Sequence, residues 1–364
     1  MVDEPAISLV TLGWTPARAG EFEAFAAAGL VPGRVSLEHN HVFRVMTESG
    51  EVLAESAGRM KHEADGRTHL PVVGDWVAVR LDARGSRSQI RHVLERTTSF
   101  SRKVAGRTTV EQVLAANIDT VFVVYGLGDG VNVRGIERYL VVARQSGAAP
   151  VVVLNKADLA KDVAADQHAA ALVSAGVPVV AASTRTGLGM AALEPYLRAG
   201  QTIALLGPSG AGKSTIVNHL IGSDVLKTGA VREWDARGRH TSVHRQLVVR
   251  GAGGMVIDTP GLRELQLWDA EGMNDTFADI ADFGVSCRFR DCRHDREPGC
   301  AVKAAVDAGA VDPGRYAGFL KLQREQEAMA RKREAREQDP SKRSVKIQQR
   351  ALRALQKDRR KSGR

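Results

Sequence analysis

The sequence predicts a multidomain α/β protein with a small β-barrel near its start, a parallel sheet covered by helices in its middle and a helical module at its end. Short strand-like runs follow Leu30, apolar β-branched runs alternate with helical stretches from about Gln112, and only helical runs follow a Cys/His cluster beyond Leu267. The 364 residues also exceed one ordinary domain. The predicted units are an extension (1–30), a barrel (31–105), an α/β domain (106–270), a Cys/His module (271–320) and a basic helical tail (321–364).

The extension and the barrel are predicted from local sequence patterns. Residues 1–30 are Ala-rich and predicted to be helical around EFEAFAAAG. The runs RVSLEHNHVFRVMT, EVLAESAG, VVGDWVAVRLD and SQIRHVLE follow, each bounded by Gly, Asp or Asn. Short strands at this spacing predict a small antiparallel barrel, and the OB-fold is the usual barrel of this size. An SH3-like or irregular barrel fits the periodicity equally well.

The middle of the chain has the pattern of a parallel sheet. TVFVVYG, PVVVLNK, VPVVAAS, TIALLG and GMVIDTPG are apolar runs that each end in a polar loop, and helical stretches lie between them. Strands that alternate with helices predict a parallel sheet covered on both faces. In such sheets the loops at the carboxyl ends of the strands form the ligand site.

The charge of the chain is concentrated in its tail. The net charge is +9, but residues 321–364 alone carry 16 Lys+Arg and 6 Asp+Glu, so the remainder is close to neutral. A basic arm indicates nucleic acid or an acidic surface as partner, and a solvated charged helix is an equal alternative. No apolar run approaches the roughly 18 residues that span a bilayer, and the N-terminus carries acids where a signal peptide has basic residues. We therefore expect a cytoplasmic protein without membrane contact.

A phosphate-binding loop follows the strand TIALLG. The sequence fits Gly-x4-Gly-Lys-Ser between a strand and a helix, which is the setting that a P-loop requires. The glycines let backbone N–H groups turn towards one anion, and the helix N-terminus adds its positive end. Lys213 is expected to reach the β- and γ-phosphates, and the Ser214 hydroxyl is expected to bind Mg²⁺. The predicted nucleotide-binding residues of this loop are Gly207, Pro208, Ser209, Gly210, Ala211, Gly212, Lys213, Ser214 and Thr215.

Two further loops predict that the nucleotide is a guanine nucleotide. Asn155-Lys156-Ala157-Asp158 ends the strand VVVLN, and an aspartate there can accept hydrogen bonds from N1–H and N2–H₂ of guanine. Adenine lacks this pair of donors. Ser183-Thr184-Arg185 resembles the Ser-Ala-Lys loop that backs the base in GTPases, although only Ser183 matches it. A P-loop ATPase or kinase is the rival interpretation, and the Asn-Lys-x-Asp loop argues against it.

The order of the motifs differs from that of Ras-like GTPases. MVIDTPGL supplies Asp258, where the Mg²⁺-water ligand belongs, and Gly261, whose N–H can meet the γ-phosphate. In Ras-like GTPases the phosphate loop comes first and the Asn-Lys-x-Asp loop last. Here Asn155 and Ser183 precede Gly207, and Asp258 comes last. This order predicts a circularly permuted GTPase domain.

These motifs, together with LPVVGDWVAV, AANIDTVFVV and RGRHTSVHRQL, resemble the RsgA/YjeQ family of small-subunit-dependent ribosomal GTPases over roughly residues 30–320. The resemblance implies an OB-fold, a permuted GTPase domain and a C-terminal zinc domain. It implies a GTPase that binds the 30S subunit and 16S rRNA, assists late 30S maturation and hydrolyses GTP to GDP with ribosomal stimulation. We expect a monomer. An RNA-binding adaptor with a scaffold nucleotide domain is the alternative.

The residue that orients the attacking water in Ras-like GTPases is absent from its usual position in this sequence. They place a glutamine after Asp-x-x-Gly to orient water, whereas this chain has Leu262, which cannot bind water. In the polar segment GAVREWDARGRHTSVHRQL, Thr241 is the candidate Mg²⁺ ligand, and Ser242 stands where the family usually has a second threonine. His240 is the candidate catalytic residue, as water-positioning group or general base, or it is a solvent-facing loop histidine; His244 is a weaker substitute.

The three cysteines of the chain form a metal-binding pattern with one histidine. Cys287-x4-Cys292-x-His294-x5-Cys300 supplies a closed Cys₃His set, typical of structural zinc, and it matches the C-terminal signature of the family. Three buried free thiols would need a core that this segment lacks. The chain leaves the GTPase domain just after Gly261, so the switch leads directly towards the zinc module, and we hypothesise that the two are coupled.

The barrel supplies candidate RNA contacts, because OB-folds bind nucleic acid through grooves with basic and stacking residues. These candidates are Arg34, His39, His41, Arg44 and Arg59.

Overall fold

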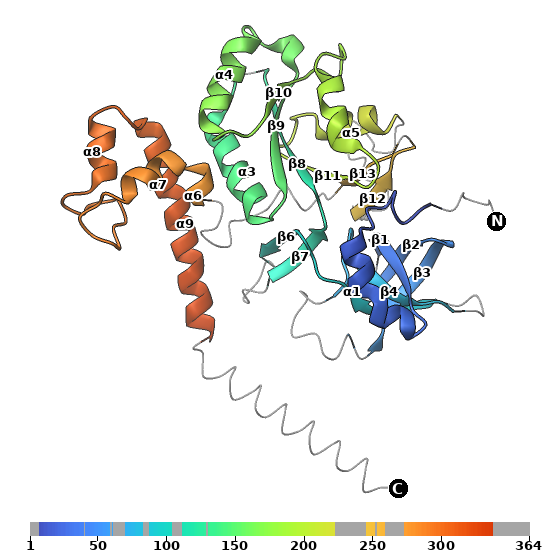
Figure 1. Cartoon of the computed structure of the whole chain (residues 1–364). Helices are drawn as coiled ribbons and strands as arrows, with labels where there is room; N and C mark the ends of the chain where they lie inside the picture. Colours follow the sequence, from blue (N-terminus) through green and yellow to red (C-terminus); the bar gives the residue numbers. More distant parts are fainter. Residues whose placement is uncertain are drawn as a thin grey trace, which may run out of the picture.

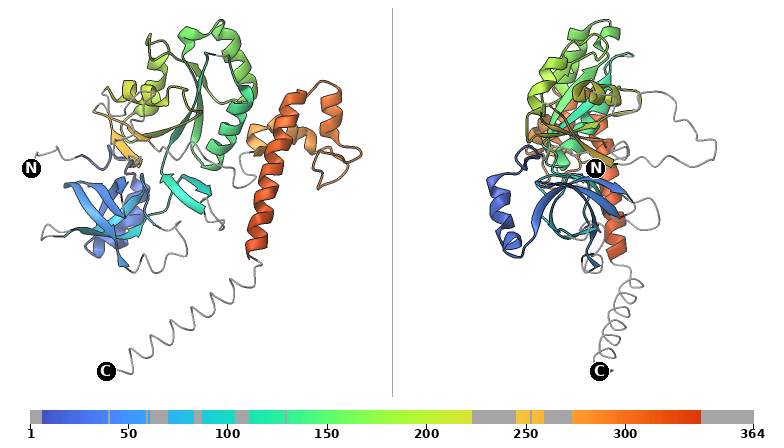
Figure 2. Two further views of the ribbon diagram at one scale, coloured as in Figure 1. Left: turned by 180° about the vertical axis from the view of Figure 1, so that it is seen from behind. Right: turned by 90° about the vertical axis from the view of Figure 1, so that its right-hand side faces the viewer.

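The computed structural model describes residues 7–39, 41–58, 60, 70–82, 87–103, 111–128, 130–222, 245–251, 253–258 and 273–337. Figure 1 shows three bodies: the barrel in blue, the α/β domain in green and yellow, and a helical module in orange. The fold class predicted from the sequence is confirmed. A long C-terminal helix extends from the orange module away from the α/β domain (Figure 2).

The barrel is an OB-fold, and its strand order excludes the SH3-like alternative. Its five strands follow the closed order β1-β2-β3-β5-β4-β1, in which β3 and β5 are parallel and the other neighbours antiparallel. Val35, Val45, Val77 and Ile90 are fully buried within it. The elements are α1 (Pro16–Ala27), β1 (Val31–His39), β2 (Val42–Thr47), β3 (Gly50–Ser56), β4 (Trp76–Arg80) and β5 (Ser88–Val93).

The predicted N-terminal helix α1 caps the barrel. Thr15 is its N-cap, with Oγ1 accepting from the backbone N–H of Arg18, and Pro16 follows at the first helical position. Phe22 is buried, and Trp14 lies edge-on to both Phe22 and Trp76 at centroid distances of 5.6 and 4.8 Å. The aromatic contacts therefore fix the helix on the barrel.

The α/β domain has the parallel sheet that its sequence predicts. The strand order is β10-β9-β8-β11-β13-β12, with only β12 antiparallel to its neighbour in this set. Val121 and Val123 of β8 face the core under α3, whereas Phe122 and Val124 face the core under α5. Its strands are β8 (Thr120–Gly126), β9 (Ala149–Asn155), β10 (Val179–Ala181), β11 (Thr202–Leu206), β12 (Arg245–Val249) and β13 (Met255–Asp258).

Helices cover both faces of this sheet (Figure 1). Its helices are α3 (Val133–Gln145), η2 (Ala157–Leu159), α4 (Val163–Val173), η3 (Met190–Leu197) and α5 (Lys213–Ile221). A separate hairpin of β6 (Ser99–Lys103) and β7 (Glu111–Ala116) joins the barrel to the α/β domain, across the predicted boundary at residue 105.

The helical module sits on α3 through one buried arginine. It comprises α6 (Met273–Thr276), α7 (Ala278–Gly284), α8 (Ala301–Asp307) and α9 (Pro313–Glu337). Arg315 of α9 donates to Glu137 of α3, whose side chain is 1% exposed, and to both carboxylate oxygens of Asp279 at 2.7 and 2.8 Å. Its guanidinium also lies 4.8 Å from the ring centroid of Phe277. The contact with Glu137 joins the module to the α/β domain, and the pairs Arg134–Asp312 and Arg138–Glu325 add to this attachment, whereas Asp279 and Phe277 belong to the module itself.

The junction between barrel and α/β domain holds a second buried arginine. Arg34 is 2% exposed and donates to the carbonyls of Leu12, Gly74 and Asn117 and to Sδ of Met255. Burial lowers the pKa of its guanidinium to about 10, still far above neutrality, so the side chain stays charged. The proposal that Arg34 contacts RNA is therefore wrong, because its donors are already used inside the protein.

Candidate functional site

The phosphate-loop motif lies at the carboxyl edge of the parallel sheet. β11 ends at Leu206, the loop follows, and α5 begins at Lys213. The parallel register also brings the ends of β8 and β9 to this edge, since Gly126 pairs with Asn155. Strand, loop and helix therefore have the arrangement that the sequence predicts for an anion site at a helix N-terminus.

Two positions of the loop require glycine, because neighbouring atoms lie too close to the backbone for a side chain. Gly207 has φ +140° and Gly212 has φ +92°, a region that L side chains rarely adopt. An added Cβ at Gly207 would collide with the carbonyl of Val124, and one at Gly212 would collide with Nδ2 of Asn155. The loop is thus packed tightly against the neighbouring strand ends.

Lys213 is folded over its own loop. It is buried, and Nζ donates to the carbonyls of Gly207 and Pro208 at 2.7 and 2.6 Å. The ammonium group therefore lies above the loop that would cradle an anion. Ser214 follows in the first turn of α5 and is half-buried.

Asn155 joins the Asn-Lys-x-Asp loop to the phosphate loop. Its Nδ2 donates to the carbonyl of Ala211 at 2.9 Å, and its side chain is buried. Its Oδ1 is buried without a hydrogen-bond partner. A buried polar atom without a partner is costly and rare, so its position at this edge fits a site completed by a ligand. The next residue, Lys156, has φ +59°, which turns the chain into η2.

Ser183 holds the carboxylate of Asp158 in place. Its Oγ donates to Oδ1 of Asp158 at 2.6 Å, while Arg185 Nη1 lies 3.5 Å from Oδ2. The hydrogen bond from Ser183 is the main cause that lowers the pKa of the Asp158 carboxyl, with a smaller effect from Arg185. Asp158 therefore remains an ionised, hydrogen-bond-accepting group. The sequence placed Ser183 near the base and did not show that it orients Asp158.

Asp258 ends β13 at the same edge. Its neighbour Ile257 pairs with Ala204 of β11, the strand that leads into the phosphate loop, and Asp258 itself is half-buried. The other predicted residues of the two switch segments lie outside the described residues: His240, Thr241, Ser242, His244, Gly261 and Leu262. Arg59 of the barrel does as well.

The Cys₃His cluster has the dimensions of a tetrahedral metal site. The ligand atoms of Cys287, Cys292, His294 and Cys300 all lie within 4.8 Å of one another. The Sγ atoms of Cys287 and Cys300 are 3.9 Å apart, and each is 3.5 Å from Nδ1 of His294. Zinc–ligand bonds of the usual length place two sulfurs about 3.8 Å apart and a sulfur about 3.6 Å from a nitrogen. The residues therefore fit a metal ion.

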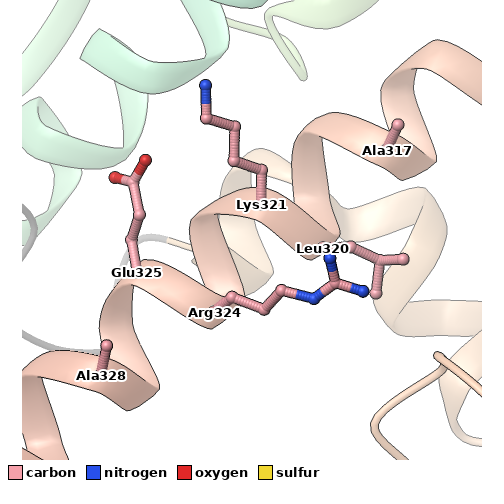
Figure 3. A pocket seen from close by; sticks show the side chains of 6 residues that line it. All are labelled: Ala317, Leu320, Lys321, Arg324, Glu325 and Ala328. Carbon is pink, nitrogen blue, oxygen red and sulfur yellow. The ribbon is translucent and has the colours of Figure 1, made fainter.

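A shallow hollow of about 470 Å³ lies along α9 and is a different feature (Figure 3). Lys321 and Glu325 project from one side of the helix, and Arg324 runs along it towards Leu320. The hollow shares no residue with the phosphate loop, and its charges are mixed. It is therefore not the nucleotide site.

Comparison with known proteins identifies the family. The RsgA GTPase family model matches residues 93–268. The protein named small ribosomal subunit biogenesis GTPase RsgA from Opitutus terrae is 48% identical over 336 residues, which cover 90% of this chain and 92% of that protein. The chain belongs to the RsgA GTPase family. Like other RsgA GTPases it is a GTP-hydrolysing enzyme.

Solved structures share the architecture of this RsgA GTPase. The crystal structure of YjeQ from Thermotoga maritima is 28% identical, with a TM-score of 0.62, and the match covers 82% of this chain and 98% of that one. YloQ, described as a circularly permuted GTPase, shares the fold at 22% identity and a TM-score of 0.58, over 82% of this chain and 96% of its own. The predicted circular permutation is confirmed by this shared fold together with the order of the elements in this chain, because the loops after β9 and β11 both precede Asp258 at the end of β13. Among the described residues, none of the helices of this RsgA GTPase could cross a membrane.

Proposed function

We propose that this chain binds the 30S ribosomal subunit, assists its late maturation and hydrolyses GTP to GDP and phosphate with stimulation by the ribosome. The observation that carries the proposal is the Ser183–Asp158 hydrogen bond beside a phosphate loop to which Asn155 is joined. An oriented aspartate for the base and a phosphate loop beside it together suit a guanine nucleotide. The names of the relatives, small ribosomal subunit biogenesis GTPases, supply the subunit.

The phosphate end of the nucleotide is assigned to the loop before α5. Backbone N–H groups and the helix N-terminus would face the phosphates, and Lys213 would move from its own loop carbonyls to the β- and γ-phosphates. Ser214 and Thr241 would hold Mg²⁺, with Asp258 binding a water of the ion. The N–H of Gly261 would meet the γ-phosphate. Mg²⁺, when bound, would neutralise charge that develops on the phosphate oxygens.

The guanine end is assigned to Asp158, with Lys156 packing on the base plane. The Ser183 hydrogen bond leaves Oδ2 and one lone pair of Oδ1 for the N1–H and N2–H₂ donors. Because the pKa of Asp158 is lowered, the carboxylate stays ionised well below neutral pH. Adenine offers no matching donors and would leave the carboxylate unsatisfied.

Asp158→Asn is expected to weaken GTP binding by about tenfold or more, ~1.4 kcal/mol, because an amide presents a donor to guanine N–H groups. Xanthine nucleotide should gain affinity. Equilibrium titration with fluorescent GTP and XTP measures both. Asp162→Asn is the matched control: it makes the same chemical change at the N-cap of α4, where asparagine also caps. Unchanged GTP affinity in the Asp158 variant would remove the guanine assignment.

Zinc is the metal proposed for the Cys₃His cluster. Three thiolates and an imidazole match its preferred tetrahedral set: all four ligand atoms lie within 4.8 Å of one another, and those of Cys287, His294 and Cys300 are 3.5–3.9 Å apart. Nδ1 of His294 faces the sulfurs, and its backbone carbonyl accepts from the hydroxyl of Tyr316 on α9. The ion would tie the loop 287–300 to the helices around it and is assigned a structural role.

The zinc module and the barrel are proposed to contact 16S rRNA. Arg288, Arg290 and Arg293 are exposed on the module, and Arg288 lies 5.6 Å from the ring centroid of Phe289, which is 40% exposed. Cationic groups beside an open ring favour RNA phosphates and bases. On the barrel, His39, His41 and Arg44 remain candidates near the β1–β2 turn. We place the protein in the cytoplasm as a monomer.

Deleting residues 338–364 is expected to weaken 30S binding and to flatten its salt dependence. These residues carry ten Lys+Arg and two Asp+Glu. A cut after Glu337 spares the packed part of α9, where Leu322 is buried and Glu325 pairs with Arg138 at 2.9 Å. For single-stranded RNA, the log–log salt slope should fall by about 0.7 for every phosphate that the tail neutralises in the full chain.

Sedimentation of both chains with 30S subunits at several salt concentrations measures the slopes. GTP binding without subunits serves as the internal control, because every nucleotide motif lies before residue 338. Parallel salt plots for the two chains would show that the tail is a solvated segment and does not lie on RNA.

A further inference from the structure

Strand β1 of the barrel belongs to two pairings in succession. Its first residues, Val31–Arg34, pair with β4 and close the barrel. The register then shifts between Val35 and Leu37, and the last residues pair with β12 of the GTPase domain. A bulge of this kind bends a strand, here out of the barrel and onto the next sheet. Barrel and GTPase domain thus share one continuous sheet of eleven strands.

The strand register connects the barrel to the carboxyl edge of the parallel sheet, where the phosphate loop and Asp258 lie and which we call the catalytic edge. Leu37 lies opposite Gln246 of β12, and Gln246 lies opposite Asp258 of β13. Neighbouring strands are about 4.8 Å apart, so a single strand separates β1 from the strand that ends in Asp258. A shift of β12 along β1 would also shift its pairing with Asp258.

An ion pair joins β1 and β12 next to the paired residues Leu37, Gln246 and Asp258. Arg245 Nη1 lies 3.8 Å from Glu38 Oε2, and the two side chains are 19% and 28% exposed. Arg245 is the first residue of β12, directly after the segment 223–244 that contains His240 and Thr241. Partial burial reduces the screening of such a pair by salt.

Arg34 contacts the opposite end of the pairing between β12 and β13. Its Nη1 contacts Sδ of Met255, the first residue of β13, at 3.3 Å. Met255 pairs with Val249, the last residue of β12. The barrel therefore contacts this strand pair at both ends, through Arg34 at Met255 of β13 and through Glu38 at Arg245 of β12.

We propose that Glu38 and Arg245 are positioning residues for GTP hydrolysis. The pair fixes the start of β12 against the barrel, and β12 pairs with β13, so the position of Asp258 at the end of β13 depends on this contact. The barrel then forms part of the framework of the catalytic edge. The inference rests on the family's GTPase activity and needs no ribosome, so hydrolysis by the chain alone tests it.

The test reverses the charges one at a time and then together. Glu38→Lys and Arg245→Glu each place like charges across the strands, and each should lower kcat for GTP hydrolysis without subunits by about three- to tenfold. GDP affinity should change by less than about twofold, since the phosphate loop and Asp158 are untouched. The Glu38→Lys/Arg245→Glu double variant should return kcat to within about twofold of the native chain.

Arg87→Glu is the matched control, because it reverses one partner of the exposed Arg87–Glu55 pair on the far side of the barrel. It should leave kcat unchanged. Glu38→Gln removes the pair without repulsion and should lower kcat by about twofold, which keeps the inference testable if a reversed chain folds poorly. Unchanged kcat in both single reversals, or a loss that the double variant fails to rescue, would overturn the inference. Absence of hydrolysis in the native chain both without and with 30S subunits would instead sink the proposed function.

Discussion

His240→Ala is expected to abolish most 30S-stimulated GTP hydrolysis, with a loss of about 10²-fold or more, while nucleotide affinity stays close to that of the native chain. The reason lies in Leu262, which occupies the position of the water-orienting glutamine and can neither donate nor accept a hydrogen bond. Another polar group must orient the attacking water. His240 precedes Thr241 in the segment between α5 and β12, and this segment runs into β12 opposite Asp258.

Single-turnover phosphate release with saturating 30S subunits measures this loss, and fluorescent GDP titration measures affinity. His244→Ala is the matched control within the same segment and should retain most of the stimulated rate. If the His240 variant is stimulated as strongly as the native chain, the group that positions the water lies elsewhere, on the ribosome or at His244.

Cys292→Ser is expected to bring the zinc content close to zero and to unfold the zinc module. The segment 287–300 has few buried apolar residues of its own, so metal binding supplies most of its folding free energy. A structural zinc site contributes about 10 kcal/mol or more in small modules, enough to decide whether such a segment folds. The GTPase domain, whose core under α5 shares no residue with the module, should still bind GTP.

Metal analysis of the purified chain and limited proteolysis report the two effects separately. Asp291→Ser changes the exposed neighbour of Cys292 and should keep one zinc per chain. Full zinc occupancy in the Cys292 variant would mean that the ligand set is wrong. A folded, zinc-free module would mean that the helices alone stabilise it, for instance through Arg315.

Local patterns were sufficient for most of the architecture. The phosphate loop, the Asn-Lys-x-Asp loop and the Cys₃His spacing each place their functional groups within a few residues, so sequence spacing fixes geometry. The order of these motifs was enough to predict the permutation. The choice between an OB-fold and an SH3-like barrel needed the strand order, because both barrels have the same alternation of apolar residues.

Contacts between segments that are distant in the sequence could not be predicted from such patterns. Arg34 looked like a candidate RNA contact because a single arginine in a strand carries no sign of burial; the structure shows it inside the junction, bound to Leu12, Gly74 and Asn117. The same holds for Arg315 and Glu137, which are 178 residues apart in the sequence. The role of Ser183 also depends on Asp158, 25 residues away.

The contact of Arg315 with Glu137 bears on the hypothesis that the switch is coupled to the zinc module. The module is fixed to α3 by the buried Arg315–Glu137 pair and by the more exposed pairs Arg134–Asp312 and Arg138–Glu325. A movement of the module as a rigid body would break these pairs, and separating buried charges is costly. Any signal that travels through residues 259–272 therefore has to act against this attachment.

The proposed function requires that GTP turnover is guanine-specific and depends on the small ribosomal subunit. Its most direct test is multiple-turnover phosphate release from GTP and from ATP, measured without ribosomes, with 30S subunits and with 50S subunits. We expect 30S subunits to raise GTP turnover by about tenfold or more, ~1.4 kcal/mol of barrier, and we expect no such increase with 50S subunits or with ATP. Equal GTP turnover with and without 30S subunits would rule out a subunit-dependent GTPase and favour an RNA-binding adaptor, and 30S-stimulated ATP turnover would rule out guanine specificity.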